Sequence, residues 1–363
     1  MLSYFADLRS NRNRRKMFPF ATWAKLFRET ISNRDEDLLK TVPFNGIYEL
    51  RLAIANYLHD HRGMQVYPSQ IIICSGIENL YSRLIPLLTP DAIWGSEQHG
   101  SKKIQGLFQL YHAQYRPIET DEDGICIDSL IEQQCNIVHV SPSNMFPTSS
   151  IMPVKRRQEL LQWAAIDDHY IVEDDYDTEF RYQGKPIPTL YSMDTMGKVI
   201  YMNTFSKTMI PSLRISYMVL PFPLVEQFKD GLSFFSGTVP SLEQYVLARF
   251  ISEGYFARHV NHMKNFYKAQ RSRLFGALHA SRLNAVSTII ESNSGTHFLL
   301  KVKTRYSDSE LAVRANLHDI DVAMLTEYMD RPEFQSTLVI NYAGLHEERI
   351  DETVSRLCHV ILD

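Results

Sequence analysis

The sequence predicts an α/β fold, with a large domain built on a mostly parallel sheet and a smaller α+β domain. Short apolar runs of strand length alternate with helical patterns as far as Pro240, which is typical of a parallel sheet covered by helices on both faces. The pattern then changes to long helix, from Leu242 to His279, and to a strand-like run from Gly295 to Val302. We therefore expect a large domain over 45–240, and a small domain with an N-terminal arm formed by 1–44 and 241–363.

The elements of the large domain follow from local composition. Helices are expected over 76–88 and over 154–166, where Pro153 opens the run. Strands are expected where short runs are β-branched or apolar: 71–74, 92–94, 114–118, 137–140, 170–173, 199–202 and 216–220. Because open α/β sheets bind their ligands at the carboxyl ends of the strands, the polar residues that follow these strands are the candidate site residues.

Composition narrows the class of protein. The 363 residues are 44% hydrophobic and 22% charged, as in a globular protein with more than one domain. The formal net charge of -4 gives the molecule as a whole no attraction for nucleic acid, and no apolar run has membrane-spanning length. The cysteines show neither disulfide spacing nor a metal-ligand pattern, so we expect a cytoplasmic protein without a metal. They are Cys74, Cys126, Cys135 and Cys358.

A lysine follows the expected strand 199–202 at a position that suits a ligand site. Thr204, Ser206 and Lys207 come directly after the strand, and Arg214 follows closely. Lysine forms a Schiff base with an aldehyde cofactor, and does so best when partly desolvated. The two hydroxyls and Arg214 are suited to holding a phosphate beside it.

A second polar cluster follows the expected strand 170–173, which runs into carboxylates and a phenol at 173–177. On its own, a Ser-Lys pair is typical of a solvated loop, and an acidic cluster is typical of a helix cap or a turn. Both clusters, however, follow buried strands, where their side chains can meet. Lysine, carboxylate, phenol and phosphate clamp together predict a site for pyridoxal 5′-phosphate (PLP).

The same segments carry a family resemblance. Glu173–Tyr182 resembles the Glu-Asp-Asp-Tyr-Asp-Ser-Glu-Phe-Arg-Tyr signature of MocR-type proteins, in which an aminotransferase-like domain of fold-type I normally follows a GntR-type winged helix. Thr204–Thr208 with Leu213-Arg214 is similar to that family's lysine motif, with Asn203 in place of Gly. Further matches run from Phe18 onward. The resemblance implies a fold-type I PLP enzyme, a small-molecule amino substrate and a homodimer.

The resemblance also implies a role for each catalytic candidate. Lys207 is expected to hold the cofactor and to move protons at the substrate. Asp174 is expected to pair with the pyridine nitrogen, with Asp175 on the opposite face of the strand. Tyr176 then points the same way as Asp174 and meets the phenolic oxygen of the cofactor.

The phosphate is expected at the N-terminus of the helix that begins near Gly76, where free N–H groups and the helix dipole favour an anion. Arg214 is the charged member of this cradle. Asn144 is a further polar contact. The cofactor-binding candidates are thus Ser75, Gly76, Ile77, Asn144, Asp174, Tyr176, Thr204, Ser206, Lys207 and Arg214.

Several positions depart from the family's pattern. Val339 stands at the position of the arginine that holds the substrate carboxylate, and Glu78 stands where relatives have Gln. An added carboxylate beside a phosphate repels it unless it is turned away. The aromatic expected over the ring is replaced within 97–101, and the tyrosine that reaches the neighbour's phosphate is replaced near Thr41. Substitute polar contacts are sought among Asn144, His99, Lys102 and Arg331.

The basic run near the N-terminus, Arg9 to Lys16, precedes no apolar segment and is therefore not a secretory signal. Contact with phosphates is one interpretation, and packing on a partner subunit is the favoured one. The segment before Phe18 leaves no room for a winged helix, so nucleic acid is not an expected partner.

Three functions remain open. The favoured one is a PLP-dependent aminotransferase acting on an amino acid or amine, in a specialised biosynthesis. The second is another PLP reaction, catalysed by a decarboxylase, lyase, racemase or cyclase, because the altered substrate pocket decides which bond breaks. The third is a non-catalytic PLP-binding regulatory domain.

Overall fold

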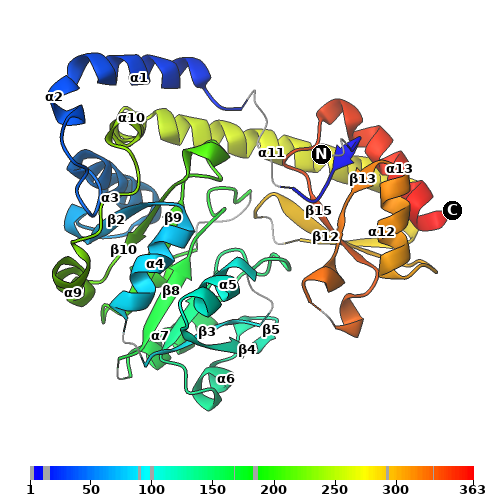
Figure 1. Cartoon of the computed structure of the whole chain (residues 1–363). Helices are drawn as coiled ribbons and strands as arrows, with labels where there is room; N and C mark the ends of the chain where they lie inside the picture. The colour runs from blue at the N-terminus through cyan, green and yellow to red at the C-terminus, as the bar shows by residue number, and fades with distance from the viewer. Residues whose placement is uncertain are drawn as a thin grey trace.

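A computed structural model describes residues 4–10, 17–88, 91–98, 102–166, 168–182, 187–291, 294–329 and 331–363. Two sheets organise the molecule (Figure 1). The larger sheet contains the seven strands expected from the sequence, all parallel except one, β10, which runs antiparallel to both neighbours. In spatial order its strands are β2 (Ile71–Ser75), β10 (Ile215–Val219), β9 (Val199–Thr204), β8 (Tyr170–Asp174), β7 (Ile137–Val140), β3 (Ile93–Glu97) and β4 (Gln114–Ile118).

Alternation of side chains along each strand gives the large sheet two buried faces. Ile72 and Cys74 of β2 face α4 (Ile77–Leu87), α5 (Lys102–Leu110) and α9 (Phe222–Leu232). Ile71 and Ile73 face α3 (Tyr48–Arg62) and α10 (Ser241–Ser252). Each fully buried aliphatic side chain stabilises the fold by about 1.5–3 kcal/mol, so both helical layers are held firmly. The remaining elements of this domain are β5 (Thr120–Asp121), β6 (Gly124–Ile125), α6 (Ile127–Glu132), α7 (Val154–Ala164) and α8 (Leu190–Met193).

The smaller sheet is antiparallel and packs against three helices. Its strands, in order, are β11 (Ser287–Ile290), β12 (His297–Val302), β15 (Thr337–Asn341) and β14 (Ala323–Met324). The helices are α11 (Tyr255–Ala280), α12 (Asp308–Leu317) and α13 (Ile350–Leu362).

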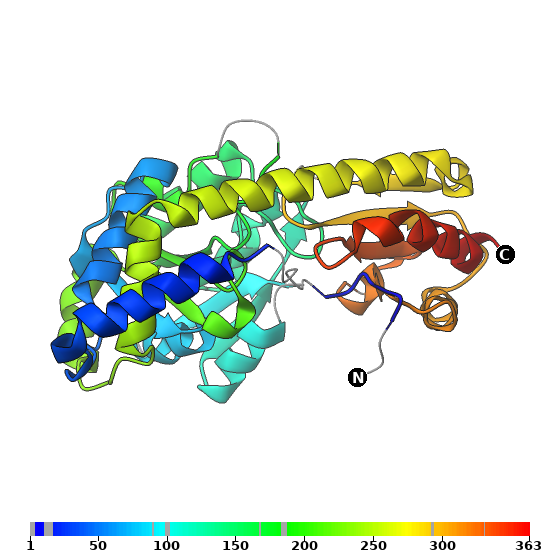
Figure 2. The ribbon, with the colours of Figure 1, turned by 90° about the horizontal axis from the view of Figure 1, so that it is seen from above.

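The N-terminal segment lies on the small domain (Figure 2). β1 (Ala6–Asp7) pairs in parallel with β13 (Ile320–Asp321), and Arg9 forms ion pairs with Asp321 and Glu327 at 3.0 and 2.7 Å. Arg9 therefore binds its own chain. The other basic residues of the expected arm, Arg12, Arg14, Arg15 and Lys16, lie outside the described residues.

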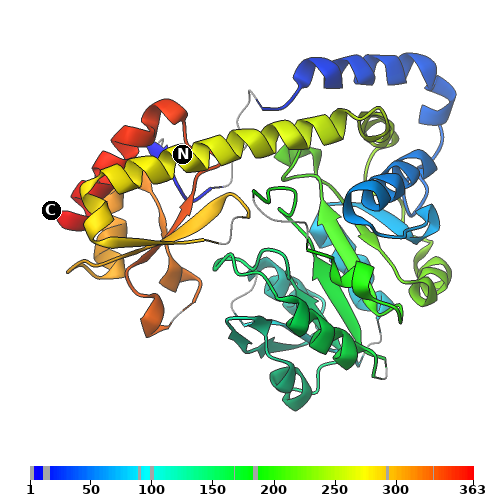
Figure 3. The ribbon, with the colours of Figure 1, turned by 180° about the vertical axis from the view of Figure 1, so that it is seen from behind.

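The single long helix expected over 242–279 is wrong, because the structure divides it at Gly254. Gly254 adopts a left-handed φ of 76°, a conformation that ends helices and that suits glycine best. The second helix, α11, spans the two domains (Figure 3). Phe256 packs in the core beneath the large sheet, whereas Met263 and Leu274 pack in the core of the small domain.

Helix α1 (Phe20–Asn33), which leads into α2 (Asp35–Leu38), lies beside the large domain. Leu26 of α1 shares a core with Leu50 of α3 and Leu247 of α10. We therefore propose that α1 and α10 belong with the large domain, so that this domain extends beyond the boundaries expected at residues 45 and 240. In the described ranges, no helix combines the length and apolarity needed to cross a bilayer.

One buried acid joins α3, β8 and β9. The carboxylate of Asp175 forms an ion pair with Arg62, and it accepts hydrogen bonds from the Tyr201 hydroxyl at 2.7 Å and the Thr178 hydroxyl at 3.1 Å. The side chain of Asp175 is fully buried and that of Arg62 is 15% exposed. A buried charge of this kind depends on its partner, because desolvation otherwise makes it costly.

We predict that Arg62→Met lowers the free energy of unfolding by about 3–5 kcal/mol, because it leaves the Asp175 carboxylate buried without its cation. Chemical denaturation measures this loss. Arg282→Met is the control, since Arg282 pairs with Asp363 at the surface, where such pairs contribute about 0–1 kcal/mol. Equal and small losses in the two variants would contradict the prediction.

Candidate active site

The expected site residues share the carboxyl edge of the large sheet. Asp174 and Thr204 end β8 and β9, and Ser75 ends β2. Because β10 is antiparallel, it begins at this same edge: Ile215 lies opposite Ser75, and Ser216 lies opposite Thr204. Arg214, which directly precedes β10, is thereby brought to the same edge.

Asp174 and Asp175 point to opposite faces, as the alternation predicts. Asp175 faces α3, whereas Asp174 faces His139 of β7, whose Nε2 lies 3.6 Å from the Asp174 carboxylate. His139 is 5% exposed, and within the described part of the chain its Nε2 makes no hydrogen bond. The ring of Tyr81 packs against His139, with centroids 6.1 Å apart. His139 was not among the expected site residues; its position inside the expected buried strand 137–140 is the only hint of it that the sequence carries.

Tyr176 and Asn144 are linked directly. The Tyr176 hydroxyl donates to the backbone carbonyl of Asn144 at 2.9 Å. Exclusion of water, followed by the charges of Asp177, Asp174 and Glu97, raises the pKa of Tyr176 well above its usual value, so the phenol keeps its proton. Asn144 is 1% exposed, and its side-chain amide finds no partner among the described residues. Such an unsatisfied buried amide costs about 1–3 kcal/mol and is suited to a ligand.

The lysine lies beside these groups. Lys207 Nζ is 4.0 Å from the carboxylate of Asp177 and 5.8 Å from the centroid of the Tyr176 ring. The Lys207 side chain is 35% exposed, whereas that of Asp177 is only 3% exposed. The Lys207 amine is thus partly withdrawn from water and held near an acid, a partner that the sequence analysis did not assign.

The expected phosphate cradle already contains a carboxylate. Gly76 has a φ of 84° and precedes α4, and a Cβ placed there would lie 2.6 Å from Glu78 Oε2 and would overlap the Arg214 guanidinium. Arg214 Nη2 donates to both oxygens of Glu78, at 2.9 and 2.7 Å. Lys103 also forms an ion pair with Glu78. Glu78 therefore turns toward the cradle, and not away from it.

The hydroxyl residues of the cradle differ in availability. The Ser206 hydroxyl is buried and has no partner among the described residues. The Thr204 hydroxyl accepts a hydrogen bond from Ser216 at 2.9 Å, so it is engaged within the sheet edge. The N–H of Ser75 donates to Thr238 at 2.8 Å. Ile77, another expected contact of the cofactor, carries no hydroxyl; its side chain packs against the hydrophobic core between α4 and the large sheet. Ser206 and Arg214 are therefore the stronger anion ligands of this set.

An apolar cavity of about 540 Å³ opens beside the loop that follows Asn144. Val339 does not line it, but packs in the adjoining cluster with Leu299 and Met329. Arg331 lines the cavity, whereas Lys102 donates to the Glu327 carbonyl at 3.5 Å and His99 lies outside the described residues. The apolar lining consists mainly of Met145, Phe146, Pro147, Ile290, Leu299, Leu325, Met329 and Phe334.

Glu97 connects this cavity with the polar site. It lines the cavity and is 5% exposed, and burial raises its pKa to about 7, although the charge of His139 lowers it. The loop after Asn144 is held from the small domain, because His297 Nε2 lies 2.8 Å from the Ser149 hydroxyl and 3.2 Å from the Pro147 carbonyl. Both domains therefore shape the site.

Comparison with known proteins shows the family to which this chain belongs. The chain matches the family Aminotransferase class I and II over residues 5–357, and it belongs to that family. YdeL of Bacillus subtilis (strain 168), an uncharacterized HTH-type transcriptional regulator, is 36% identical over 341 residues, which cover 94% of this chain and 73% of YdeL. MocR of Rhizobium meliloti, a probable rhizopine catabolism regulatory protein, is 34% identical over 345 residues, covering 94% and 69%. The resemblance to MocR-type proteins is confirmed.

The fold is confirmed as fold-type I. The crystal structure of Pyrococcus horikoshii kynurenine aminotransferase, in complex with PMP, superposes with a TM-score of 0.84 at 22% sequence identity, covering 99% of this chain and 91% of that chain. Family membership implies PLP as the cofactor. The unsatisfied Asn144 amide, the unsatisfied Ser206 hydroxyl and a carboxylate bound at the helix N-terminus fit a ligand that carries hydrogen-bonding groups and an anion.

The pKa of Glu97 yields a prediction about stability. A carboxyl whose pKa is about 7 in the folded chain and about 4.5 when unfolded takes up a proton on folding between these two values. The stabilisation that this proton uptake gives the folded chain is fully present below pH 4.5 and is lost as the pH rises to 7.

We therefore expect the free energy of unfolding of the native chain, relative to Glu97→Gln, to fall by about 2–3 kcal/mol between these pH values. Urea denaturation of both proteins at several pH values measures the difference. A difference that stays constant with pH would show that Glu97 does not titrate in this range.

Proposed function

We propose that the chain is a PLP-dependent aminotransferase that acts on an amino acid or amine with an apolar group. The observation that carries this proposal is the convergence of Lys207, Asp174, Tyr176, Asn144 and Arg214 at one edge of the sheet, with the Asn144 amide left unsatisfied. The roles that these residue types can take in PLP chemistry also support transamination.

PLP supplies an aldehyde that combines with amines and a ring that accepts electrons from the substrate's α-carbon. Lys207 would hold the cofactor at its aldehyde carbon, and its amine, when free, would hold or move the proton of the substrate's α-carbon. Asp174, which lies beside His139, would keep the ring nitrogen protonated. The Asn144 amide would donate toward the phenolic oxygen, and so would the Tyr176 hydroxyl in place of its hydrogen bond to the Asn144 carbonyl. Arg214 and Ser206 would bind the phosphate.

The substrate end is apolar. Because Val339 packs among Leu299 and Met329, no arginine extends from this position of β15 toward the site. The apolar cavity of about 540 Å³ suits a hydrocarbon or aromatic group of the substrate. Charged groups also line the cavity: Glu97, Asp121, Glu122, Lys301, Arg331 and Glu333. Among these, we propose that Arg331 and Glu97 select the polar end of the substrate.

A homodimer is part of the proposal. Large apolar side chains are exposed on and near α1 and α3, among them Leu39 at 90%, Tyr48 at 56% and Phe20 at 49%. Exposed apolar groups of this size favour a protein partner, and a second copy fits the family. A solution mass of one chain would overturn this part.

The four cysteines are all free thiols, which supports a reducing, cytoplasmic setting.

A regulatory role is the second candidate, and the identity to YdeL and MocR favours it. A sensor domain of this kind needs the same PLP site but no turnover. The two functions therefore predict the same cofactor binding and different fates of the bound cofactor.

The test is a PLP titration followed by a pool of amino donors. We expect an absorption band of lysine-bound PLP near the visible range, and its conversion to pyridoxamine phosphate, detected by mass spectrometry, when a donor is accepted. Lys207→Ala is expected to lose the band, because it removes the amine that would bind the aldehyde. Lys264→Ala is the matched control, because that lysine lines a different pocket.

A band that forms and persists with all donors, without formation of any product, would favour the regulatory domain. A band that persists while a decarboxylated, eliminated, racemised or cyclised product forms would favour the other PLP reactions. Absence of PLP binding would overturn the proposal.

A further inference from the structure

Glu78 occupies the place in the cradle that an anion is expected to take. Its carboxylate accepts from Arg214 at 2.7 and 2.9 Å, forms an ion pair with Lys103, and lies where a Cβ on Gly76 would approach it to 2.6 Å. Gly76 leads into α4, so the carboxylate also lies in the positive field of the helix N-terminus. Helix dipole, guanidinium and ammonium thus converge on one internal acid.

This arrangement keeps Glu78 ionised. Partial burial raises its pKa, but hydrogen bonds from Lys103 and its own backbone N–H, with the charges of Lys103 and Arg214, lower it by more, so the net shift is downward. The side chains of Glu78 and Arg214 are 33% and 45% exposed, and ion pairs in contact with water are weak. The carboxylate is therefore bound, but it can be displaced.

We propose that Glu78 determines how strongly the cradle binds phosphate, because its carboxylate holds the anion position until the phosphate of a ligand displaces it. This inference rests on the proposed function, since it takes PLP as the ligand. A dianionic phosphate replaces a single carboxylate at Arg214 and releases Glu78 and Lys103 from the cradle. The apparent affinity falls by the fraction of molecules in which Glu78 leaves the cradle open.

The inference separates phosphorylated from unphosphorylated ligands. PLP must displace Glu78, whereas pyridoxal, which has no phosphate, reaches Lys207 without entering the cradle. Removal of the Glu78 charge should therefore strengthen PLP binding and leave pyridoxal binding unchanged. A general effect on the fold or on Lys207 would change both ligands together.

The experiment is an equilibrium titration of the native chain and Glu78→Gln with PLP and with pyridoxal, followed by absorbance. We expect Glu78→Gln to bind PLP on the order of tenfold more tightly, with pyridoxal affinity unchanged. Glu78→Ala provides a second variant with the same expected direction, and circular dichroism reports whether each variant is folded.

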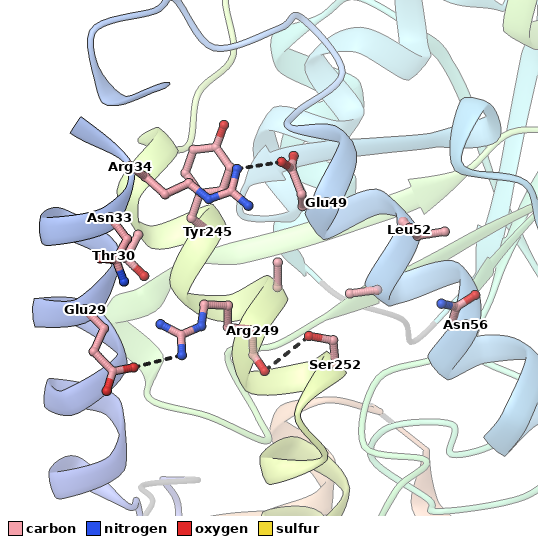
Figure 4. Close-up of a pocket in the computed structure, with 12 residues that line it drawn as sticks. Glu29, Thr30, Asn33, Arg34, Glu49, Leu52, Asn56, Tyr245, Arg249 and Ser252 are labelled. Carbon is pink, nitrogen blue, oxygen red and sulfur yellow. Dashed lines mark hydrogen bonds and ion pairs between the residues drawn. The ribbon is translucent and has the colours of Figure 1, made fainter. Parts of the chain in front are cut away.

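Glu29→Gln is the matched control. Glu29 also pairs with an arginine at 2.8 Å, Arg249, with comparable exposure of 37% and 34%, but it lies between α1 and α10 (Figure 4). This variant should bind PLP as the native chain does.

The outcomes separate the inference from the proposed function. Equal or weaker PLP binding by folded Glu78→Gln, beside clear binding by the native chain, would overturn the inference alone. If neither protein binds PLP, both the inference and the proposed function fail. Binding that appears only in Glu78→Gln would support the inference and overturn the proposed function of the native chain.

Discussion

The buried carboxylate of Asp175 holds together the elements on which the site depends. It joins α3 through Arg62 and β9 through the Tyr201 hydroxyl, at the point where β8 ends. Because neighbouring side chains alternate, fixing Asp175 toward α3 directs Asp174 toward His139 on the other face. Catalytic groups need support of this kind, since small displacements reduce their effect.

The two ends of the site differ in character. At the phosphate end, Arg214, Lys103 and Glu78 form a charged group at the start of α4. At the substrate end, the place where an arginine would hold a carboxylate is filled by Val339 and its apolar neighbours. Under the proposed function, the cofactor would be bound by charge in a cradle that already carries its own anion, and the substrate would be selected mainly by shape and apolar contact.

Much of this architecture was predictable from the sequence. The seven strands of the large sheet and the opposite directions of Asp174 and Asp175 follow from apolar runs and from the two-residue period of strands. The break at Gly254 was missed because its effect depends on a left-handed φ that composition alone does not reveal. His139 was missed because the register of β7 against β8 is a tertiary property.

The direction of Glu78 shows the same limit. The sequence marks it as an acid beside an expected phosphate, and electrostatic repulsion alone predicts that it turns away. The structure turns it inward, because Arg214 and Lys103 lie far from it in the sequence and meet it only in the folded chain.

Reduction of the PLP-treated protein with borohydride, followed by peptide mass spectrometry, shows whether Lys207 binds the cofactor. Reduction fixes a lysine-bound PLP as a stable secondary amine, so the modified residue can be located. We predict the added mass on Lys207, at stoichiometric amounts and at low PLP concentration. Equal labelling of surface lysines, or an unmodified Lys207, would contradict it.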